Sequence, residues 1–205
     1  MTAHPKANNV ALVGYITSSK EKTFTLDHQH YGEKFYSFTL EVERQSGTKD
    51  YLPIIASEKL IDRQQTYEKT PVCIIGQFRS YNQNIGDSRH LVLYVFAQNL
   101  FITDNDDMNE VRISGFLCRK PTFRTTPLGR QIADLLIAVN RPYGKSDYIP
   151  CICWGRNAIY ASRLEVGSSI NFIGRLQSRE YQKCIDDISS TKTAYEVSII
   201  NIDGE

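Results

Sequence analysis

The chain has 205 residues, of which 41% are hydrophobic and 23% are charged, a composition typical of a folded globular protein and not of a disordered one. Its formal net charge is only +1, and no stretch approaches the roughly 18 consecutive apolar residues of a membrane-spanning helix. The residues before Val10 are polar and lack the apolar run of a secretion signal, so we expect a cytoplasmic protein without membrane contact.

Three short segments occur twice, in the same order and about 100 residues apart. The offsets between the two copies are 101, 97 and 98 residues, which predicts an internal duplication. The paired segments are Val10–Ile16 with Val111–Leu117, Asp50–Pro53 with Asp147–Pro150, and Ile75–Ser80 with Ile173–Ser178. The polar segment Thr103–Met108 joins the copies and is short enough to hold them close together.

Each copy has the residue pattern of three strands, a short helix and two further strands. In the second copy, alternating apolar residues predict strands at about 109–118, 131–141, 147–153, 169–181 and 193–202. Residues 157–164 fit a short helix that ends before Gly167. Five strands with a helix between the third and the fourth are the order of the oligonucleotide-binding (OB) barrel. We therefore predict an all-β fold of two tandem five-stranded OB barrels, at 1–103 and 108–205, each with such a helix.

The predicted fourth strand of the second copy has two chemically different faces. The residues expected to point into the barrel core are Ile170, Phe172, Gly174 and Leu176. The opposite face is polar, basic and aromatic, and consists of Asn171, Arg175, Gln177, Arg179 and Tyr181. The second half is also the more basic one, because residues 108–205 hold 13 Lys and Arg against 10 Asp and Glu. We expect a ligand on this basic face.

Several motifs of the second copy together indicate a family. They are Ser114–Leu117, Pro121–Gly129, Ile137–Arg141, Asp147–Gly155 and Gly174–Tyr181. Through these motifs, residues of about 109–202 resemble the bacterial single-stranded-DNA-binding protein (SSB) family. The resemblance implies a nucleoid-associated protein, not an enzyme, that binds single-stranded DNA in replication, repair or recombination. RNA is an alternative ligand, since nothing in the sequence separates the two sugars.

In the SSB family, bases stack on aromatic rings outside the barrel while cations contact the phosphates, so binding is independent of base sequence. By position in the motifs, the resemblance places the stacking sites on Tyr143, Tyr148, Trp154 and Tyr181. The other candidate DNA-binding residues are Phe123, Arg124, Arg141, Lys145, Arg175 and Arg179.

These side chains also have purely structural interpretations. Trp154 could be a core residue that closes the end of the barrel. Its parity favours exposure, because Tyr148 and Trp154 alternate with Cys151 and Cys153 along the predicted third strand. Arg124, in the first loop, could be a solvated charge without a ligand.

The first copy keeps the skeleton of the repeat but fewer of the family's residues. Ser57 stands where the second copy has Trp154, and Gln83 stands where it has a tyrosine. Glu41 and Glu43 would repel a phosphate chain. We therefore expect a structural first barrel that takes the place of a partner barrel, and two chains that form a homodimer with four barrels. The alternative is weak binding by the first copy through Tyr36, Tyr51, Arg79, Tyr81 and Arg89.

The sequence predicts no metal, cofactor or catalytic site. The odd number of scattered cysteines favours small buried side chains: Cys73, Cys118, Cys151, Cys153 and Cys184. His28 and His30 form a His-x-His pair, but no clear third ligand follows. No phosphate loop, serine elbow or dinucleotide-binding glycine pattern is present.

One alternative function remains open. The chain ends soon after its last predicted strand, so we expect it to lack the acidic recruiting tail of bacterial SSB proteins. Together with the loss of aromatic residues in the first copy, this leaves room for an OB-fold protein-interaction module, of primosome or assembly type, that binds nucleic acid weakly.

Overall fold

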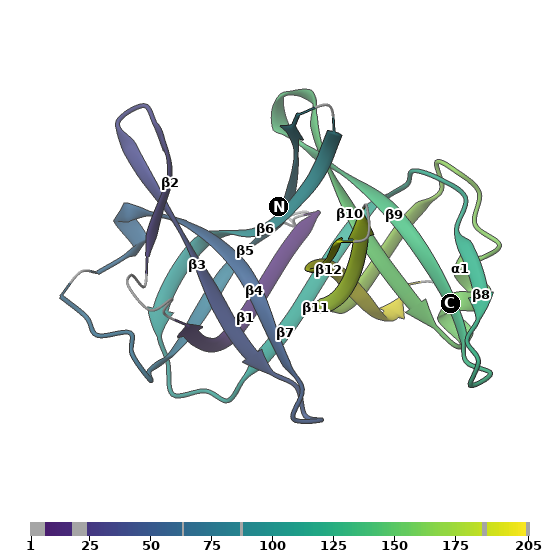
Figure 1. Ribbon diagram of the computed structural model, residues 1–205, viewed down its shortest axis with the longest axis horizontal. Helices are drawn as coiled ribbons and strands as arrows, with labels where there is room; N and C mark the ends of the chain where they lie inside the picture. The colour runs from purple at the N-terminus through teal and green to yellow at the C-terminus, as the bar shows by residue number, and fades with distance from the viewer. Residues whose placement is uncertain (1–6, 18–23, 63, 87, 186–187, 204–205) are drawn as a thin grey trace, which may run out of the picture.

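The computed structural model describes residues 7–17, 24–62, 64–86, 88–185 and 188–203. In this part of the chain two β-barrels lie side by side, one from each copy of the repeat (Figure 1). Their strands form one hydrogen-bonded series of 12 strands within the described ranges.

Five strands close the first barrel. They are β1 (Asn8–Thr17), β3 (Glu33–Glu43), β4 (Lys49–Ser57), β5 (Pro71–Ile85) and β6 (Ser88–Ile102). Strand β1 pairs antiparallel with both β3 and β5, and the parallel pair β4–β6 closes the ring. The short strand β2 (Thr25–His30) extends β3 outside the closed ring.

The second barrel repeats this topology. Its strands are β7 (Met108–Leu117), β9 (Gln131–Arg141), β10 (Lys145–Trp154), β11 (Ser169–Ile185) and β12 (Ile188–Ile202). Here β7 pairs with both β9 and β11, the parallel pair β10–β12 closes the ring, and β8 (Thr122–Thr125) extends β9. The predicted all-β fold of two tandem OB barrels is confirmed.

The two barrels differ in the segment that follows their third strand and covers one end of the core. In the second barrel, helix α1 (Arg156–Ala161) buries Ala158 and Ala161 completely. The helix predicted for the first barrel is wrong for its described residues, where a single 3-10 turn, η1 (Glu58–Leu60), takes its place. The chain beyond this turn buries the ring of Tyr67 edge-on against Phe24. Among the described residues, no helix is long and apolar enough to cross a membrane.

The barrel cores follow the alternation expected from the sequence. In β9, Leu135, Ile137 and Val139 are all buried, and in β11 so are Phe172 and Leu176. Because inward positions alternate with outward ones along each strand, the same alternation places the intervening polar side chains on the barrel surface.

The barrels are joined by direct strand pairing. Strands β1 and β7 run antiparallel across the junction, with Val10 opposite Val111 and Asn8 opposite Ile113. The junction therefore contains backbone hydrogen bonds of a continuous sheet as well as side-chain packing.

Four polar residues strengthen this junction, three of them buried and Ser178 half-buried, and we call them the clasp: Ser80, Asp147, Asp50 and Ser178. The backbone N–H of Ser80 in the first barrel donates to Oδ1 of Asp147 in the second, at 2.7 Å. In the equivalent contact of the repeat, the N–H of Ser178 in the second barrel donates to Oδ1 of Asp50 in the first, at 2.8 Å. Both carboxylates are fully buried. All four residues lie in the repeated segments, so each copy of the repeat contributes one aspartate and one serine to the junction.

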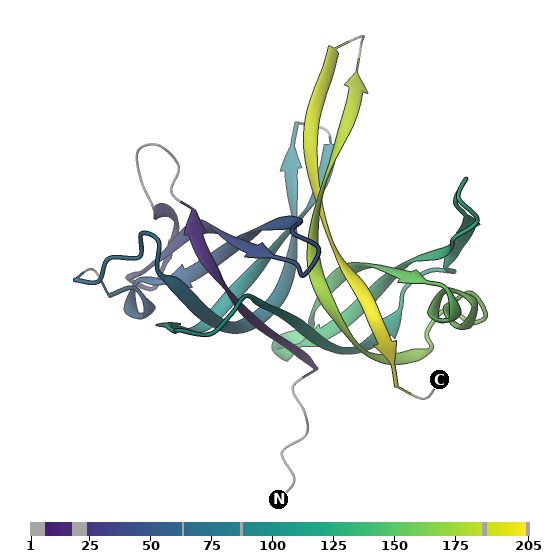
Figure 2. The same cartoon turned by 90° about the horizontal axis from the view of Figure 1, so that it is seen from below.

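The hairpins β5–β6 and β11–β12 extend well beyond their barrels. Their pairing continues to Ile85–Ser88 in the first and to Ile185–Ile188 in the second. Figure 2 shows both hairpins leaving the body of the molecule on the same side. The second hairpin is longer than the predicted strands 169–181 and 193–202.

Candidate nucleic-acid interface

Three aromatic rings of the second barrel point outward from its strands. Tyr148 and Trp154 of β10 are 40% and 41% exposed, and Tyr181 of β11 is 41% exposed. Trp154 is thus not sealed in the core, as its structural interpretation would require. A half-exposed ring is held by its buried edge and offers one face to a ligand, which is the geometry that base stacking needs.

The outward direction of these rings follows from strand parity. The alternate residues of β10 are buried: Asp147, Ile149, Cys151 and Cys153. The N–H of Tyr148 donates to the hydroxyl of Ser80 at 2.7 Å, so the clasp fixes the backbone of this tyrosine. The matching bond in the first barrel joins the N–H of Tyr51 to the hydroxyl of Ser178 at 3.0 Å.

The turn between β9 and β10 carries three further candidates. Tyr143 lies in a 3-10 turn, η2 (Pro142–Gly144), with a φ of 64° and a side chain that is 97% exposed. Lys145, the first residue of β10, is also exposed. Arg141 instead lies at the junction, where its Nε is 3.2 Å from Oδ2 of Asp147. Burial raises the pKa of Asp147 despite this cation.

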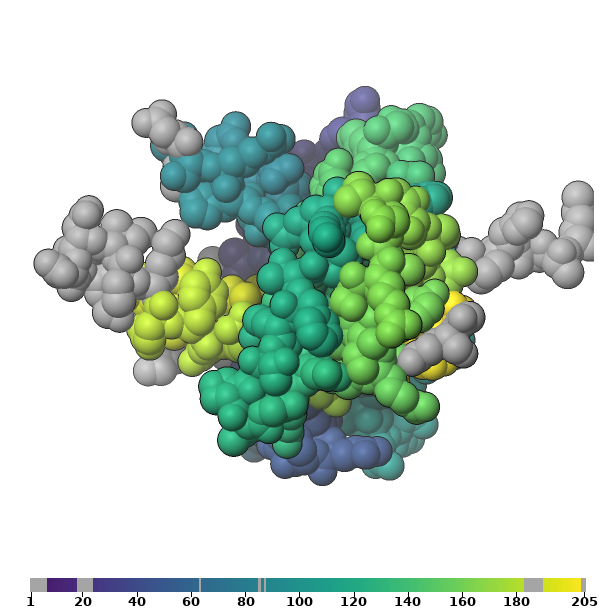
Figure 3. Space-filling model, turned by 90° about the vertical axis from the view of Figure 1, so that its right-hand side faces the viewer, coloured from purple at the N-terminus to yellow at the C-terminus, as the bar shows by residue number. Residues whose placement is uncertain are grey.

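Strand β8 presents Phe123 and Arg124, so the loop position expected for Arg124 is wrong. The Phe123 ring is exposed, and Nε of Arg124 lies 3.1 Å from Oδ2 of Asp134. An exposed ion pair of this kind is weak, so Arg124 can leave the Asp134 carboxylate and bind a phosphate at little cost in free energy. Figure 3 shows this side of the second barrel, with the β11–β12 hairpin projecting from the body.

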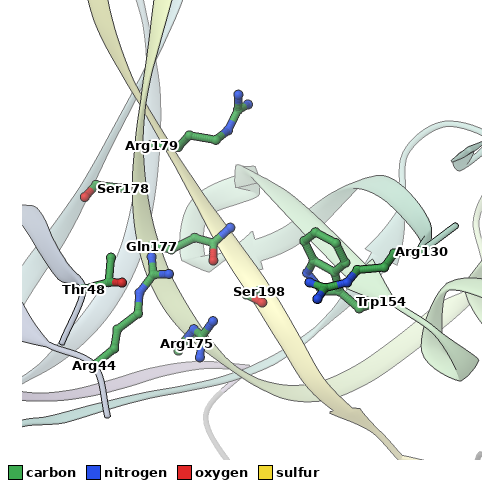
Figure 4. Close-up of a pocket in the computed structure, with 9 residues that line it drawn as sticks. All are labelled: Arg44, Thr48, Arg130, Trp154, Arg175, Gln177, Ser178, Arg179 and Ser198. Atoms are coloured by element: carbon green, nitrogen blue, oxygen red, sulfur yellow. The ribbon is translucent and has the colours of Figure 1, made fainter. Parts of the chain in front are cut away.

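A hollow of about 460 Å³ opens beside Trp154. We call it the arginine hollow, and the residues that line it are Arg44, Thr48, Arg130, Trp154, Arg175, Gln177, Ser178, Arg179 and Ser198. Figure 4 shows Arg175 between Arg44, which comes from the first barrel, and Trp154 on the opposite side. The Nε of Arg175 is buried and has no hydrogen-bond partner among the described residues. Such a donor favours an oxyanion ligand.

The corresponding surface of the first barrel is occupied by its own polar contacts. Ser57, at the place of Trp154, donates to Glu33, whose other oxygen accepts from Nζ of Lys59 at 2.6 Å. The Lys59 ammonium and the Ser57 hydroxyl lower the pKa of Glu33. Glu41 is likewise paired with Lys49 at 2.6 Å. This acidic surface suits phosphate poorly, although Tyr51 and Tyr81 remain exposed.

A match to a family model covers residues 108–203, and its description is the single-strand binding protein family. A single-stranded DNA-binding protein of Oceanobacillus iheyensis is 33% identical over 100 residues, which are 45% of this chain and 59% of that protein. One from Halalkalibacterium halodurans is 37% identical over 81 residues, 36% of this chain and 48% of that protein. The second barrel is therefore similar to the single-strand binding protein family.

The relationship to this SSB family lies in the second barrel, and the chain spans about half the length of the curated relatives it matches. The tandem arrangement has its own parallel among solved structures. The wild-type single-stranded DNA binding protein from Thermus aquaticus superposes with a TM-score of 0.76 at 18% identity. The superposition covers 96% of this chain and 91% of that one, so the two proteins share their fold across both barrels.

Two of the residues that line the arginine hollow, Arg44 and Thr48, come from the first barrel, and sequence analysis did not identify them. They belong to the first copy, whose acidic composition had suggested a structural role. One signal was present in the sequence, because Arg44 and Arg141 recur at the same offset of 97 residues as Asp50 and Asp147. The repeat shows that an arginine accompanies each aspartate, but not which pair faces an open hollow.

The cysteines whose side chains the structure describes are buried or half-buried, and His28 has local structural partners. Cys73, Cys151 and Cys153 are buried and Cys118 is half-buried, while the side chain of Cys184 lies outside the described residues. Burial raises the pKa of the Cys151 thiol, which keeps it in its unreactive protonated form. His28 bonds to Asp27 and stacks on Phe35. Within the described ranges, no group of three or more His, Cys, Asp or Glu could hold a metal ion.

Proposed function

We propose that this protein binds single-stranded DNA independently of base sequence, in replication, repair or recombination. The observation that carries the proposal is the set of outward rings, Tyr148, Trp154 and Tyr181, together with the hollow beside Trp154 that four arginines line. Rings offer stacking to any base, and guanidinium groups contact phosphate. The curated relatives of the second barrel are named as single-stranded DNA-binding proteins. Because proteins of this family bind DNA and are not enzymes, the function includes no catalytic step.

The proposed binding residues are those of the second barrel, at 108–205. Tyr143, Tyr148, Trp154 and Tyr181 stack on bases, assisted by Phe123. Arg124, Arg141, Lys145, Arg175 and Arg179 contact the phosphates. Arg141 differs from the others because it must leave Asp147 to do so.

Titration with thymidine oligomers tests this function directly. Trp154 is the only tryptophan, so its fluorescence reports one position of the surface. Saturating oligomer should quench the emission, and added salt should weaken binding, since bound cations displace counterions. RNA oligomers of equal length measure the preference for sugar. Absence of binding to both, with partner proteins retained on purification, would instead indicate a protein-interaction module.

Trp154→Ala should weaken binding by about 1–3 kcal/mol, the range for one stacked base. Trp154→Phe is the control, because it keeps an aromatic face and should retain most of the affinity. Unchanged affinity of the alanine variant would remove Trp154 from the binding site.

The first barrel, at 1–103, serves chiefly as the structural partner of the second. This proposal is supported by the β1–β7 pairing, by the clasp, and by the ion pairs that occupy its acidic surface. If it is correct, Tyr51→Ala and Tyr81→Ala should change affinity for thymidine oligomers much less than Tyr148→Ala and Tyr181→Ala. Equal losses in both sets would show that the two barrels bind alike.

Two chains form a homodimer through the sheet that spans the junction. Tyr15, Met108 and Phe116 are exposed on the outer face of β1 and β7, away from the barrel cores. Strand register adds Phe101 to the same face, because Phe101 lies opposite Cys73, which lies opposite Val13. An apolar face of this kind favours association.

The mass in solution decides the oligomeric state. Light scattering should give about twice the chain mass of 23.4 kDa. Met108→Lys together with Phe101→Glu should halve it, because charges would then be buried in the interface. A wild-type chain that remains monomeric at micromolar concentration would contradict the homodimer.

A further inference from the structure

The arginine hollow is a composite of both barrels. Arg175 and Arg179 come from β11 of the second barrel, whereas Arg44 and Thr48 come from the turn that joins β3 to β4 in the first. That turn is closed by two backbone bonds of 2.8 Å, Arg44 N–H to Thr48 O and Gly47 N–H to Arg44 O. The hollow therefore exists only while the two barrels are docked together.

The guanidinium of Arg44 is held in a fixed position at the edge of the hollow. Its Nε and Nη2 each donate to a carboxylate oxygen of Asp50 at 2.6 Å, and Asp50 also accepts the N–H of Ser178 from β11. Asp50 thus fixes Arg44 relative to the second barrel. A guanidinium has five N–H donors, and this pair uses two, so three remain for a ligand.

The hollow has an excess of positive charge. Its lining includes four arginines and no acidic residue. The Asp50 carboxylate compensates only Arg44, and among the described residues no carboxylate forms a salt bridge with Arg130, Arg175 or Arg179. The buried Nε of Arg175 adds a donor without a partner in the described structure. Four cations around a small space favour a phosphate group, which can accept several charge-assisted hydrogen bonds at once.

The duplicated counterpart of this hollow is chemically different. A smaller hollow of about 200 Å³ includes Gln77 and Arg79, which stand at the places of Arg175 and Gln177. Arg79 donates to Oε1 of Gln77 through Nε at 3.2 Å and Nη2 at 2.8 Å, and its guanidinium lies 4.1 Å from the centre of the Phe96 ring. The second arginine of the smaller hollow, Arg141, pairs with Asp147, which lines the same hollow. The smaller hollow thus has two arginines and one carboxylate, whereas the larger has four arginines and no carboxylate in its lining.

We propose that the arginine hollow binds a backbone phosphate of the DNA strand at the point where the strand passes from the second barrel to the first. Arg44 is then a phosphate-binding residue that the first barrel contributes. This inference rests on the proposed function, and it assigns the first barrel a direct contact at the junction in addition to its structural role. Thr48, exposed on the same turn, adds a hydroxyl donor to the same phosphate.

The test is the double variant Arg44→Gln/Asp50→Asn. It removes the cation and its buried counter-charge together, so the net charge is unchanged and no carboxylate is left unpaired. The asparagine oxygen can still accept the N–H of Ser178. The matched control is Glu41→Gln/Lys49→Gln, which removes an exposed ion pair from the same hairpin, outside the lining of the hollow.

Binding is measured with two thymidine oligomers as a function of salt. One has about 8 nucleotides, within the site size of a single OB barrel, and one has about 30, enough for both. With the longer oligomer, the variant should bind about tenfold more weakly. Its log–log salt slope should fall by about 0.7, the value for one phosphate contact on a single strand. The short oligomer and the control variant should show neither change.

An unchanged salt slope on the longer oligomer, or equal losses on both lengths, would overturn the inference while leaving the proposed function in place. Failure of the wild-type protein to bind either oligomer would instead overturn the function itself. If the double variant does not fold, Thr48→Glu provides the same test, because it places a negative charge in the hollow without touching the clasp. That variant should weaken binding of the long oligomer only.

Discussion

Tyr143 and Tyr31 share one local geometry in turns of different barrels. Each precedes a glycine, each has a positive φ, of 64° and 47°, and each side chain is 97% exposed. A bulky residue in the left-handed region is uncommon, and neither ring gains stability from burial. The two tyrosines are therefore matched in local geometry and exposure, although Tyr31 lies in the β2–β3 turn of the first barrel and Tyr143 in the β9–β10 turn of the second.

Tyr143→Ala should weaken binding of thymidine oligomers by about 1–3 kcal/mol if its ring carries one base. Tyr31→Ala should leave affinity unchanged, because Tyr31 lies on the first barrel outside the proposed site. Both variants should unfold at the same urea concentration as the wild type. The assignment of Tyr143 would be rejected if the two substitutions had the same effect on affinity.

At the scale of single residues, strand parity predicted which side chains are exposed, but it did not predict the contacts between the barrels. The alternation along β10 correctly placed Tyr148 and Trp154 outside, since parity depends only on the chain's own strand. Arg141 and Asp147 meet within the β9–β10 hairpin, but the position of Arg44 beside Arg175 depends on how the two barrels dock. No local pattern contains that information.

At the scale of elements, the repeated glycines mark close approaches between strands. A Cβ added at Gly174 of β11 would lie 2.5 Å from the backbone oxygen of Ser198 in β12. A Cβ at Gly115 of β7 would lie 2.6 Å from the backbone oxygen of Ala138 in β9. Neither contact can be relieved by a side-chain rotation, because the obstacle is backbone.

Gly174→Ala should destabilise the protein by about 1–3 kcal/mol or more, as overpacking of a fixed backbone does. Urea unfolding measures the change. Gly129→Asn is the control, because Gly129 lies in a left-handed turn with open space around it, and asparagine tolerates that conformation. A Gly174 variant as stable as the control would mean that β11 and β12 can separate without cost.

The length of the β11–β12 hairpin was underestimated from sequence for a physical reason. Inside the barrel, one face of each strand is buried and the other is wet, so apolar residues alternate. Beyond Leu176 the ribbon leaves the barrel, and residues such as Arg179 and Gln182 are exposed. Without a buried face the alternation ends before the strand does, so the pattern predicted an early end.

At the scale of the whole molecule, the two halves of the clasp are unequally strong. Asp50 accepts two bonds of 2.6 Å from Arg44, whereas Asp147 has a single contact of 3.2 Å with Arg141. Asp50→Asn should therefore lower the free energy of unfolding by about 3–5 kcal/mol, the cost of leaving one partner of a buried pair alone. Asp147→Asn should cost only about 1–2 kcal/mol. Equal costs in urea unfolding would show that the halves are equivalent.

Asp147 of the clasp should also make the stability of the protein depend on pH. Burial raises the pKa of Asp147 above its ordinary value of 3.8. The contribution of this group to stability is then fully present below 3.8 and is lost as the pH rises through the raised pKa. Between about pH 7 and pH 4, acidification should stabilise the wild type relative to Asp147→Asn. A constant difference between their urea midpoints would contradict the raised pKa.

The duplication and the order of the strands were predictable, because the repeats and the alternating pattern are properties of the sequence itself. The arrangement of the barrels was not. The segments Asp50–Pro53 and Ile75–Ser80 were recognised as repeats, but their aspartate and serine turn out to bind the opposite barrel. A repeat reveals that a residue is required twice, and only the docked structure shows what it contacts.

Fusion of the two barrels into one chain has a consequence for the direction of the bound strand. In a symmetric dimer of identical barrels, every residue occurs on both sides of the two-fold axis. A DNA strand that crosses the axis then meets the same residues whichever barrel it enters first. Here Gln77 and Arg175 occupy equivalent places with different chemistry, so the axis is broken. A strand that crosses this junction meets the two hollows in a fixed order, and its two polarities are energetically distinct.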